Sequence, residues 1–249
     1  MAKKPRTPPP PRRVQAPKQR HAARQGLDPA RQRLILYGVA AAGIIGLVVV
    51  LIVLFAGGKS SGDVGGSTDQ DVAAAMRAAG CTFKSVPPLP PKQRVPSGFH
   101  LDVPKLDSKV KWATFPPSAG SHYPLWAVWG FYRDAVNPRQ VVHNEEHGGV
   151  IIWWGPKVPA STVDELQAFY NESPLGMLGT PIAGLGNKIA LTAWTGDPAR
   201  YYQDDYYGIG KISTCTRFDE KAFTTFRDAY RGHGPEGVPL SQDAPGTGP

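Results

Sequence analysis

Four of the six histidines fall between positions 100 and 147, namely His100, His122, His143 and His147. Histidine is the commonest protein ligand for zinc and copper. In the segment HNEEHG, His143 and His147 stand four residues apart, so on a helix both imidazoles project from one face and can hold one ion. Glu146 adjoins that face and could ligate, orient an imidazole or act as a base, whereas Glu145 is expected to point elsewhere. His122 follows a tight PPSAG turn and is either a further ligand or a loop-closing hydrogen-bond donor.

Other readings of this histidine pair remain open. The order H-x-x-E-H is that of inverted zinc metalloproteases, in which two histidines bind zinc and the glutamate activates water. A hydrolase also needs a third ligand and a substrate cleft, and Glu165, Glu172 and Glu220 do not indicate one by their spacing. Alternatively, His143 and His147 are hydrogen-bonded structural residues at a helix end, where a cation complements the macrodipole. We expect His100 and His233 to be ordinary surface or loop residues.

The elements that must position these residues are predicted from local patterns. Helices are expected over 71–80, 138–147, 161–173 and 218–232, with caps at Asn137, Ser161 and Asp219 and a stop at Gly148. Strands are expected over 110–115, 149–154 and 187–196. This alternation predicts an α+β fold, one small mixed-sheet domain with packed helices. Trp126 and its aromatic neighbours could line a pocket near the histidines but are more typical of core.

An apolar run at residues 34–56 predicts a single transmembrane helix before this domain. The run carries no charge and, at 1.5 Å per residue, would extend about 35 Å, enough to cross a hydrocarbon core of about 30 Å. Residues 1–33 hold ten Lys or Arg and one acid. The positive-inside bias therefore predicts a plasma-membrane protein with a cytoplasmic N-terminus and an extracytoplasmic C-terminal domain.

The basic charge is concentrated in the N-terminal tail. The whole chain carries a net charge of +8, but outside residues 1–33 there are 18 basic and 19 acidic residues. The tail is rich in proline and has no aromatic residue to stack on a base, so we expect no nucleic-acid partner. We predict a disordered tail attracted to the anionic head groups of the lipid bilayer.

Only two cysteines occur, Cys81 and Cys215, both in the part predicted to lie outside the membrane. An oxidising compartment permits a disulfide between them, and two separate buried thiols are the alternative. Gly/Ser-rich residues 57–70 predict a flexible linker, residues 71–236 the folded domain, and residues 237–249 a disordered C-terminal tail.

Four segments resemble a bacterial family, the domain of unknown function 3105. They are FPPSAGSHYPLWAVWGFY (115–132), HNEEHGGVIIWW (143–154), IALTAWTG (189–196) and FRDAYRGHGPE (226–236). The resemblance implies an N-terminal transmembrane helix before the domain. The family pattern matches this chain at ten positions: Pro116, Pro117, Ser118, Gly120, His122, Tyr123, His143, Glu146, His147 and Gly148. The family is uncharacterised, so the resemblance implies a fold and a site but no activity.

Together these patterns favour a membrane-anchored domain that binds copper or zinc through His122, His143, His147 and Glu146, with Tyr123 and Trp126 beside the site. A metal-free interaction module is the alternative. It would help assemble an envelope or membrane complex through aromatic surfaces such as the tyrosine-rich run at 201–208. A metal-dependent hydrolase is the third reading. The sequence names no catalytic residue and leaves enzymatic activity undecided, with binding favoured.

Overall fold

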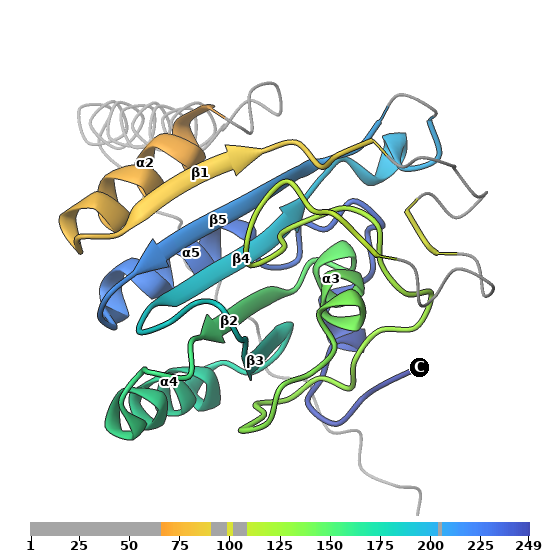
Figure 1. The fold of residues 1–249 in the computed structure, drawn as a ribbon. Coiled ribbons are helices and arrows are strands. Elements are labelled where there is room, and N and C mark those ends of the chain that lie inside the picture. The colour runs from red at the N-terminus through yellow and green to blue at the C-terminus, as the bar shows by residue number, and fades with distance from the viewer. Residues whose placement is uncertain (1–65, 91–98, 102–108, 204–205) are drawn as a thin grey trace, which may run out of the picture. The chain divides into compact units, whose positions relative to one another are not determined.

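The computed structural model describes residues 66–90, 99–101, 109–203 and 206–249, which belong to one compact unit. Its five-stranded sheet has the order β1-β5-β4-β2-β3, and only the β2–β3 pair is parallel (Figure 1). The strands are β1 (Thr82–Val86), β2 (Val150–Trp154), β3 (Met177–Pro181), β4 (Ile189–Thr195) and β5 (Ile209–Cys215). The α+β class with a mixed sheet is therefore confirmed.

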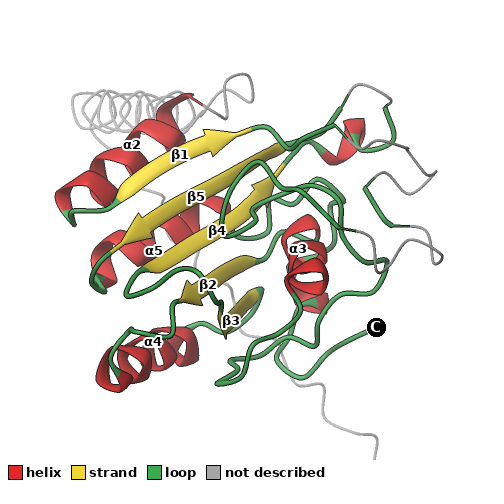
Figure 2. Ribbon diagram, viewed as in Figure 1, coloured by secondary structure: helices red, strands yellow, loops and turns green. Residues whose placement is uncertain are grey.

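Helices cover both faces of the sheet. They are α2 (Gly66–Ala78), α3 (Pro138–Glu146), α4 (Ala160–Glu172) and α5 (Glu220–Tyr230), with short 3₁₀ turns at η2 (Pro198–Arg200) and η3 (Leu240–Gln242). Because side chains alternate along a strand, Ile152 of β2 packs in the core with α2, α4 and α5. Ile151 and Trp153 pack on the other face with Val141 of α3. Loops, rather than further helices, surround α3 (Figure 2).

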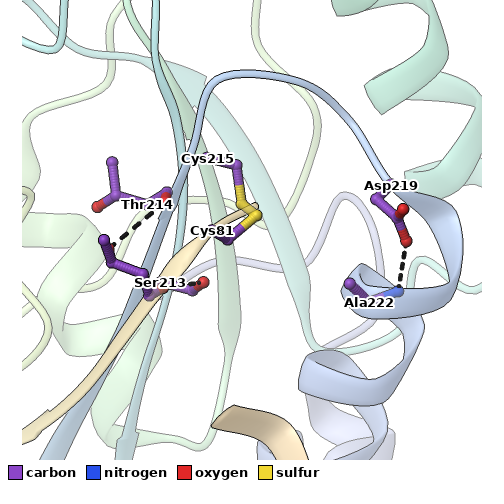
Figure 3. Close-up of a disulfide and its surroundings, with 7 residues drawn as sticks. Cys81, Ser213, Thr214, Cys215, Asp219 and Ala222 are labelled. Carbon is purple, nitrogen blue, oxygen red and sulfur yellow. Dashed lines mark hydrogen bonds between the residues drawn. A yellow bond between two sulfur atoms is a disulfide. The ribbon is translucent and has the colours of Figure 1, made fainter. Parts of the chain in front are cut away.

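The predicted disulfide is present between Cys81 and Cys215, with a Cα–Cα distance of 4.4 Å. It joins the start of β1 to the end of β5, where Thr82 is paired with Thr214 (Figure 3). Nearby, the carboxylate of Asp219 accepts a hydrogen bond from the Ala222 amide and caps α5, as the sequence predicts.

Several predicted elements need correction. Residues 110–115 form no strand, because two prolines follow and the Trp112 indole bonds to the Ser121 carbonyl within an irregular loop. Helix α4 begins at Ala160 with Pro159 at its N-cap, so Ser161 is not the cap. Residues 66–70, assigned to the linker, are the first turns of α2.

The C-terminal residues 237–249 are packed rather than loose. The Gly176 amide donates to the Asp243 carbonyl, and Trp129 exchanges backbone hydrogen bonds with Gly246 and Thr247. The Asp243 side chain is buried. Backbone hydrogen bonds thus fix a segment whose Pro/Gly-rich composition predicts disorder.

The predicted tail 1–33 and transmembrane segment 34–56 lie outside the described residues, as does linker segment 57–65. Each helix in the described part of the chain is too short or too polar to be a membrane span.

Candidate metal centre

Helix α3 carries His143 and Glu146, His147 is its C-terminal cap, and the helix is fixed at both ends. The Asn137 side chain accepts a hydrogen bond from the Arg139 amide and caps the N-terminus, with Pro138 in the first turn. At the other end Gly148 has φ +106°, and a Cβ there would lie 2.8 Å from the Gly234 nitrogen. Only glycine allows this close approach, which brings the segment after α5 against the C-terminal end of α3.

Four side chains converge beside α3. One ligand atom from each of His100, His122, His143 and Glu146 lies within 4.8 Å of the others. Both His100 Nε2 and His122 Nε2 face the same carboxylate oxygen of Glu146, at 3.2 Å and 2.9 Å. Ring centroids of the three imidazoles lie 4.8 to 5.0 Å apart. We call this set the inner group.

Two of these imidazoles are oriented by backbone carbonyls. The Nδ1 atom of His122 lies 2.8 Å from the Gly120 carbonyl oxygen, and that of His143 lies 2.8 Å from the Tyr123 carbonyl oxygen. A carbonyl only accepts, so Nδ1 carries the proton in each ring and the neutral tautomer leaves a lone pair on Nε2. A ring nitrogen that donates to a backbone carbonyl, leaving the other nitrogen free to coordinate, is typical of metal-binding histidines.

Glu146 supplies the negative charge of the inner group. Its side chain is completely buried, which alone would raise its pKa, but the imidazoles of His122 and His100 outweigh burial and hold the pKa well below its usual range. Burial and the neighbouring His122 lower the pKa of His143 to about 3. The site therefore holds a carboxylate beside a neutral His143 ring, and both are forms that bind metal.

The inner group contains polar atoms that lack a partner. Among the described residues, the Nε2 atom of His122 and the Oε1 atom of Glu146 are buried without a hydrogen bond that has acceptable geometry. His122 Nε2 lies 2.9 Å from Glu146 Oε2. A cation bound to both atoms would be coordinated by one imidazole nitrogen and one carboxylate oxygen.

A second set of ligands adjoins the first. His143, His147 and Glu236 each offer one atom within 4.8 Å of the others, and we call them the outer group. Nε2 of His147 lies 3.4 Å from Glu236, and its Nδ1 lies 3.4 Å from Asp243. Burial and repulsion from Glu146 raise the pKa of Glu236.

Two aromatic side chains flank the groups. The Trp126 ring packs on His143 and His147, with centroids 5.4 Å and 4.7 Å away. Tyr201 interacts with Glu146 and Glu236, and burial together with these carboxylates raises the pKa of its phenol.

Sequence reasoning found part of this constellation. His122, His143 and Glu146 come together as expected, and His147 meets His143 but lies in the outer group. Tyr123 contributes its carbonyl, and its hydroxyl accepts a hydrogen bond from Arg139.

His100, expected to be an ordinary loop residue, is a member of the inner group. A backbone bridge pairs it with His122, through hydrogen bonds from Leu101 to His122 and from His122 to Phe99. Glu236 of the outer group is not indicated by any spacing in the sequence. His233, by contrast, is exposed, as predicted.

Glu145 differs from its neighbour. It points away from the inner group, as expected, but it is completely buried, and its carboxylate accepts a hydrogen bond from the Thr192 hydroxyl. Burial raises its pKa well above the usual value, although the Thr192 hydrogen bond opposes this effect.

The fold and site define a class: an α+β domain, closed by a disulfide, that gathers four histidines and two glutamates around the end of one helix. A family model described as "Protein of unknown function (DUF3105)" matches residues 105–242. The chain belongs to this family. No curated protein and no solved structure matches it.

Proposed function

We propose that this domain binds one transition-metal ion, copper or zinc, through the inner group, and that its role is metal binding or delivery at a membrane surface. The observation that carries the proposal is the convergence of three imidazoles on the buried carboxylate of Glu146, with the proton of two rings fixed on the far nitrogen.

The donor set selects the class of metal. Three imidazole nitrogens and one carboxylate suit first-row transition metals, whereas Ca²⁺ and Mg²⁺ prefer oxygen ligands throughout. At metal–ligand distances of about 2.0 to 2.2 Å, neighbouring ligand atoms lie about 2.9 Å apart in an octahedron and about 3.4 Å apart in a tetrahedron. The separations of 2.9 Å and 3.2 Å from Glu146 fall within this range.

Glu146 acts as a ligand in this proposal rather than as a water-activating base. Its side chain is completely buried, one carboxylate oxygen faces His122 and His100, and the other oxygen is also buried, so neither is exposed to solvent. The H-x-x-E-H order therefore contributes ligands without the arrangement that hydrolysis by this glutamate would need.

The cellular setting is the second part of the proposal. The apolar segment 34–56 and the basic residues before it support a membrane anchor with the metal-binding domain on the extracytoplasmic side. The disulfide between Cys81 and Cys215 supports an oxidising compartment.

The test is elemental analysis of the purified full-length chain, kept in detergent, after reconstitution with Zn²⁺ or Cu²⁺ and removal of excess metal. We expect about one equivalent per chain in the wild type, and loss of that equivalent in His122→Gln and Glu146→Gln. His233→Ala removes an exposed histidine and is the matched control that keeps the metal. Circular dichroism checks that each variant is folded. A folded wild type that binds neither metal would refute the proposal.

A further inference from the structure

His143 belongs to both ligand groups, yet it has one nitrogen to offer. Its Nδ1 proton is engaged by the Tyr123 carbonyl at 2.8 Å, which leaves Nε2 as the only donor for a metal. One imidazole nitrogen binds one ion at a time. The inner and outer groups therefore cannot both be filled with all of their ligands.

The two metal positions are close neighbours. Each would lie about 2.0 to 2.1 Å from the same nitrogen, so the distance between them is at most about 4 Å. An ion can pass between such positions by exchanging its other ligands while it stays bound to His143. The ion therefore does not have to dissociate from the protein to move from one position to the other.

Glu236 is the exposed carboxylate of the two groups. Its side chain is 29 % exposed, whereas that of Glu146 is 0 % exposed, and the most exposed side chain of the inner group is His100 at 15 %. Glu236 therefore provides the carboxylate that a hydrated ion meets first. His147 stands behind it, with its Nδ1 atom 3.4 Å from the Asp243 carboxylate.

The ligand count gives the exchange a direction. The outer group supplies two imidazoles and one carboxylate, which leaves at least one coordination position for water and keeps the ion exchangeable. The inner group supplies three imidazoles and one carboxylate. Both groups contribute one negative charge, so the transfer replaces water with an additional imidazole and separates no charge.

A buried oxygen without a partner supports a ligand at the outer position. Glu236 Oε2 faces the outer position, 3.4 Å from His147 Nε2, and among the described residues it is buried without a hydrogen bond of acceptable geometry. A buried carboxylate oxygen without a partner is costly and would be satisfied by a cation or a bound water.

We propose that the outer group is the uptake position for the same ion that the inner group holds, with His143 as the ligand common to both. This inference rests on the proposed function. In the transfer, the bonds from the ion to His147, Glu236 and water break, and bonds to His100, His122 and Glu146 form. The oxidation state of the metal does not change.

The experiment is stopped-flow transfer of Zn²⁺ from a chromophoric chelator to the metal-free full-length chain, with the final stoichiometry measured in the same samples. We expect one equivalent in the wild type. Glu236→Gln and His147→Gln should still bind one equivalent, but they should do so at least tenfold more slowly. Glu172→Gln, which replaces an exposed glutamate of α4, should match the wild type in both rate and stoichiometry.

Two results would overturn the proposal that the outer group is the uptake position. Two equivalents per wild-type chain would make the groups separate sites, and unchanged rates in both Glu236→Gln and His147→Gln would remove the uptake role. Either result leaves metal binding itself intact. Absence of any Zn²⁺ uptake by the wild type would instead refute the proposed function.

Discussion

Glu145 makes a prediction that separates the two adjacent glutamates of α3. Its side chain is completely buried, and one carboxylate oxygen has no hydrogen-bond partner among the described residues. The other oxygen accepts a hydrogen bond from Thr192, which also accepts one from the Trp153 indole at 2.7 Å. Burial therefore raises the pKa of Glu145 well above its usual value, and the folded chain retains a proton there.

The sign of the pH dependence follows from this shift. The unfolded chain releases the Glu145 proton above about pH 4.5, whereas the folded chain keeps it. Stability from this group is thus complete below that pH and is lost as the pH rises toward the raised pKa, by up to about 1.4 kcal/mol per pH unit. Glu145→Gln has a similar shape and does not titrate. The variant should gain stability relative to the wild type by about 1 kcal/mol between pH 5 and pH 6.

The assay is urea unfolding of the metal-free chain with its disulfide intact, at several pH values. All six tryptophans lie between positions 112 and 194, so their fluorescence reports on this domain. Glu165→Gln, in which an exposed glutamate of α4 is replaced, should give a difference that does not vary with pH. A pH-independent difference for Glu145→Gln would refute the reasoning, because it would mean that Glu145 is ionised in the folded protein.

Two further predictions concern the links that hold the sheet together. Cys81 and Cys215 are 134 residues apart in sequence, and the chain-entropy model gives about 5 kcal/mol as an upper value for such a loop. The double alanine variant should therefore lose about 2 to 5 kcal/mol in urea unfolding, and an unchanged midpoint would contradict this estimate. Asp69→Asn removes the carboxylate 2.7 Å from the buried Lys211 ammonium and should cost about 3 kcal/mol. Asp164→Asn breaks an exposed ion pair and should cost less than about 1 kcal/mol, and equal losses would show that Lys211 does not depend on its partner.

The elements that sequence predicted well are those specified by neighbouring residues. Helix α3 is bounded by Asn137 and Gly148, and β2 is an uninterrupted run of β-branched and aromatic residues. Strand β1 pairs with β5 across more than 120 residues. Its formation depends on this distant partner, so the five residues of β1 alone do not predict a strand. Strand β3 includes Gly179 and Pro181, which are unfavourable in strands, and it forms because β2 is its partner.

The candidate site likewise contains residues placed by local sequence and residues placed by distant contacts. His143, Glu146 and His147 share one helix end, and helical periodicity is enough to place them together. His100 reaches the site through a backbone bridge to His122, 22 residues further along the chain. Such a bridge depends on tertiary packing, and an isolated histidine in a proline-rich region gives no periodic signal.

Glu236 shows why the glycines around α3 matter for chemistry as well as for packing. Gly148 and Gly234 lie so close that a side chain on either would meet backbone atoms of the other segment. This contact allows the Glu236 amide to bond to the Glu146 carbonyl, which places the Glu236 carboxylate beside His147. The C-terminal residues then add Asp243 on the other side of the same imidazole. A segment that looks unstructured by composition, residues 237–249, therefore supplies a buried carboxylate beside the candidate site, because backbone hydrogen bonds fix its path.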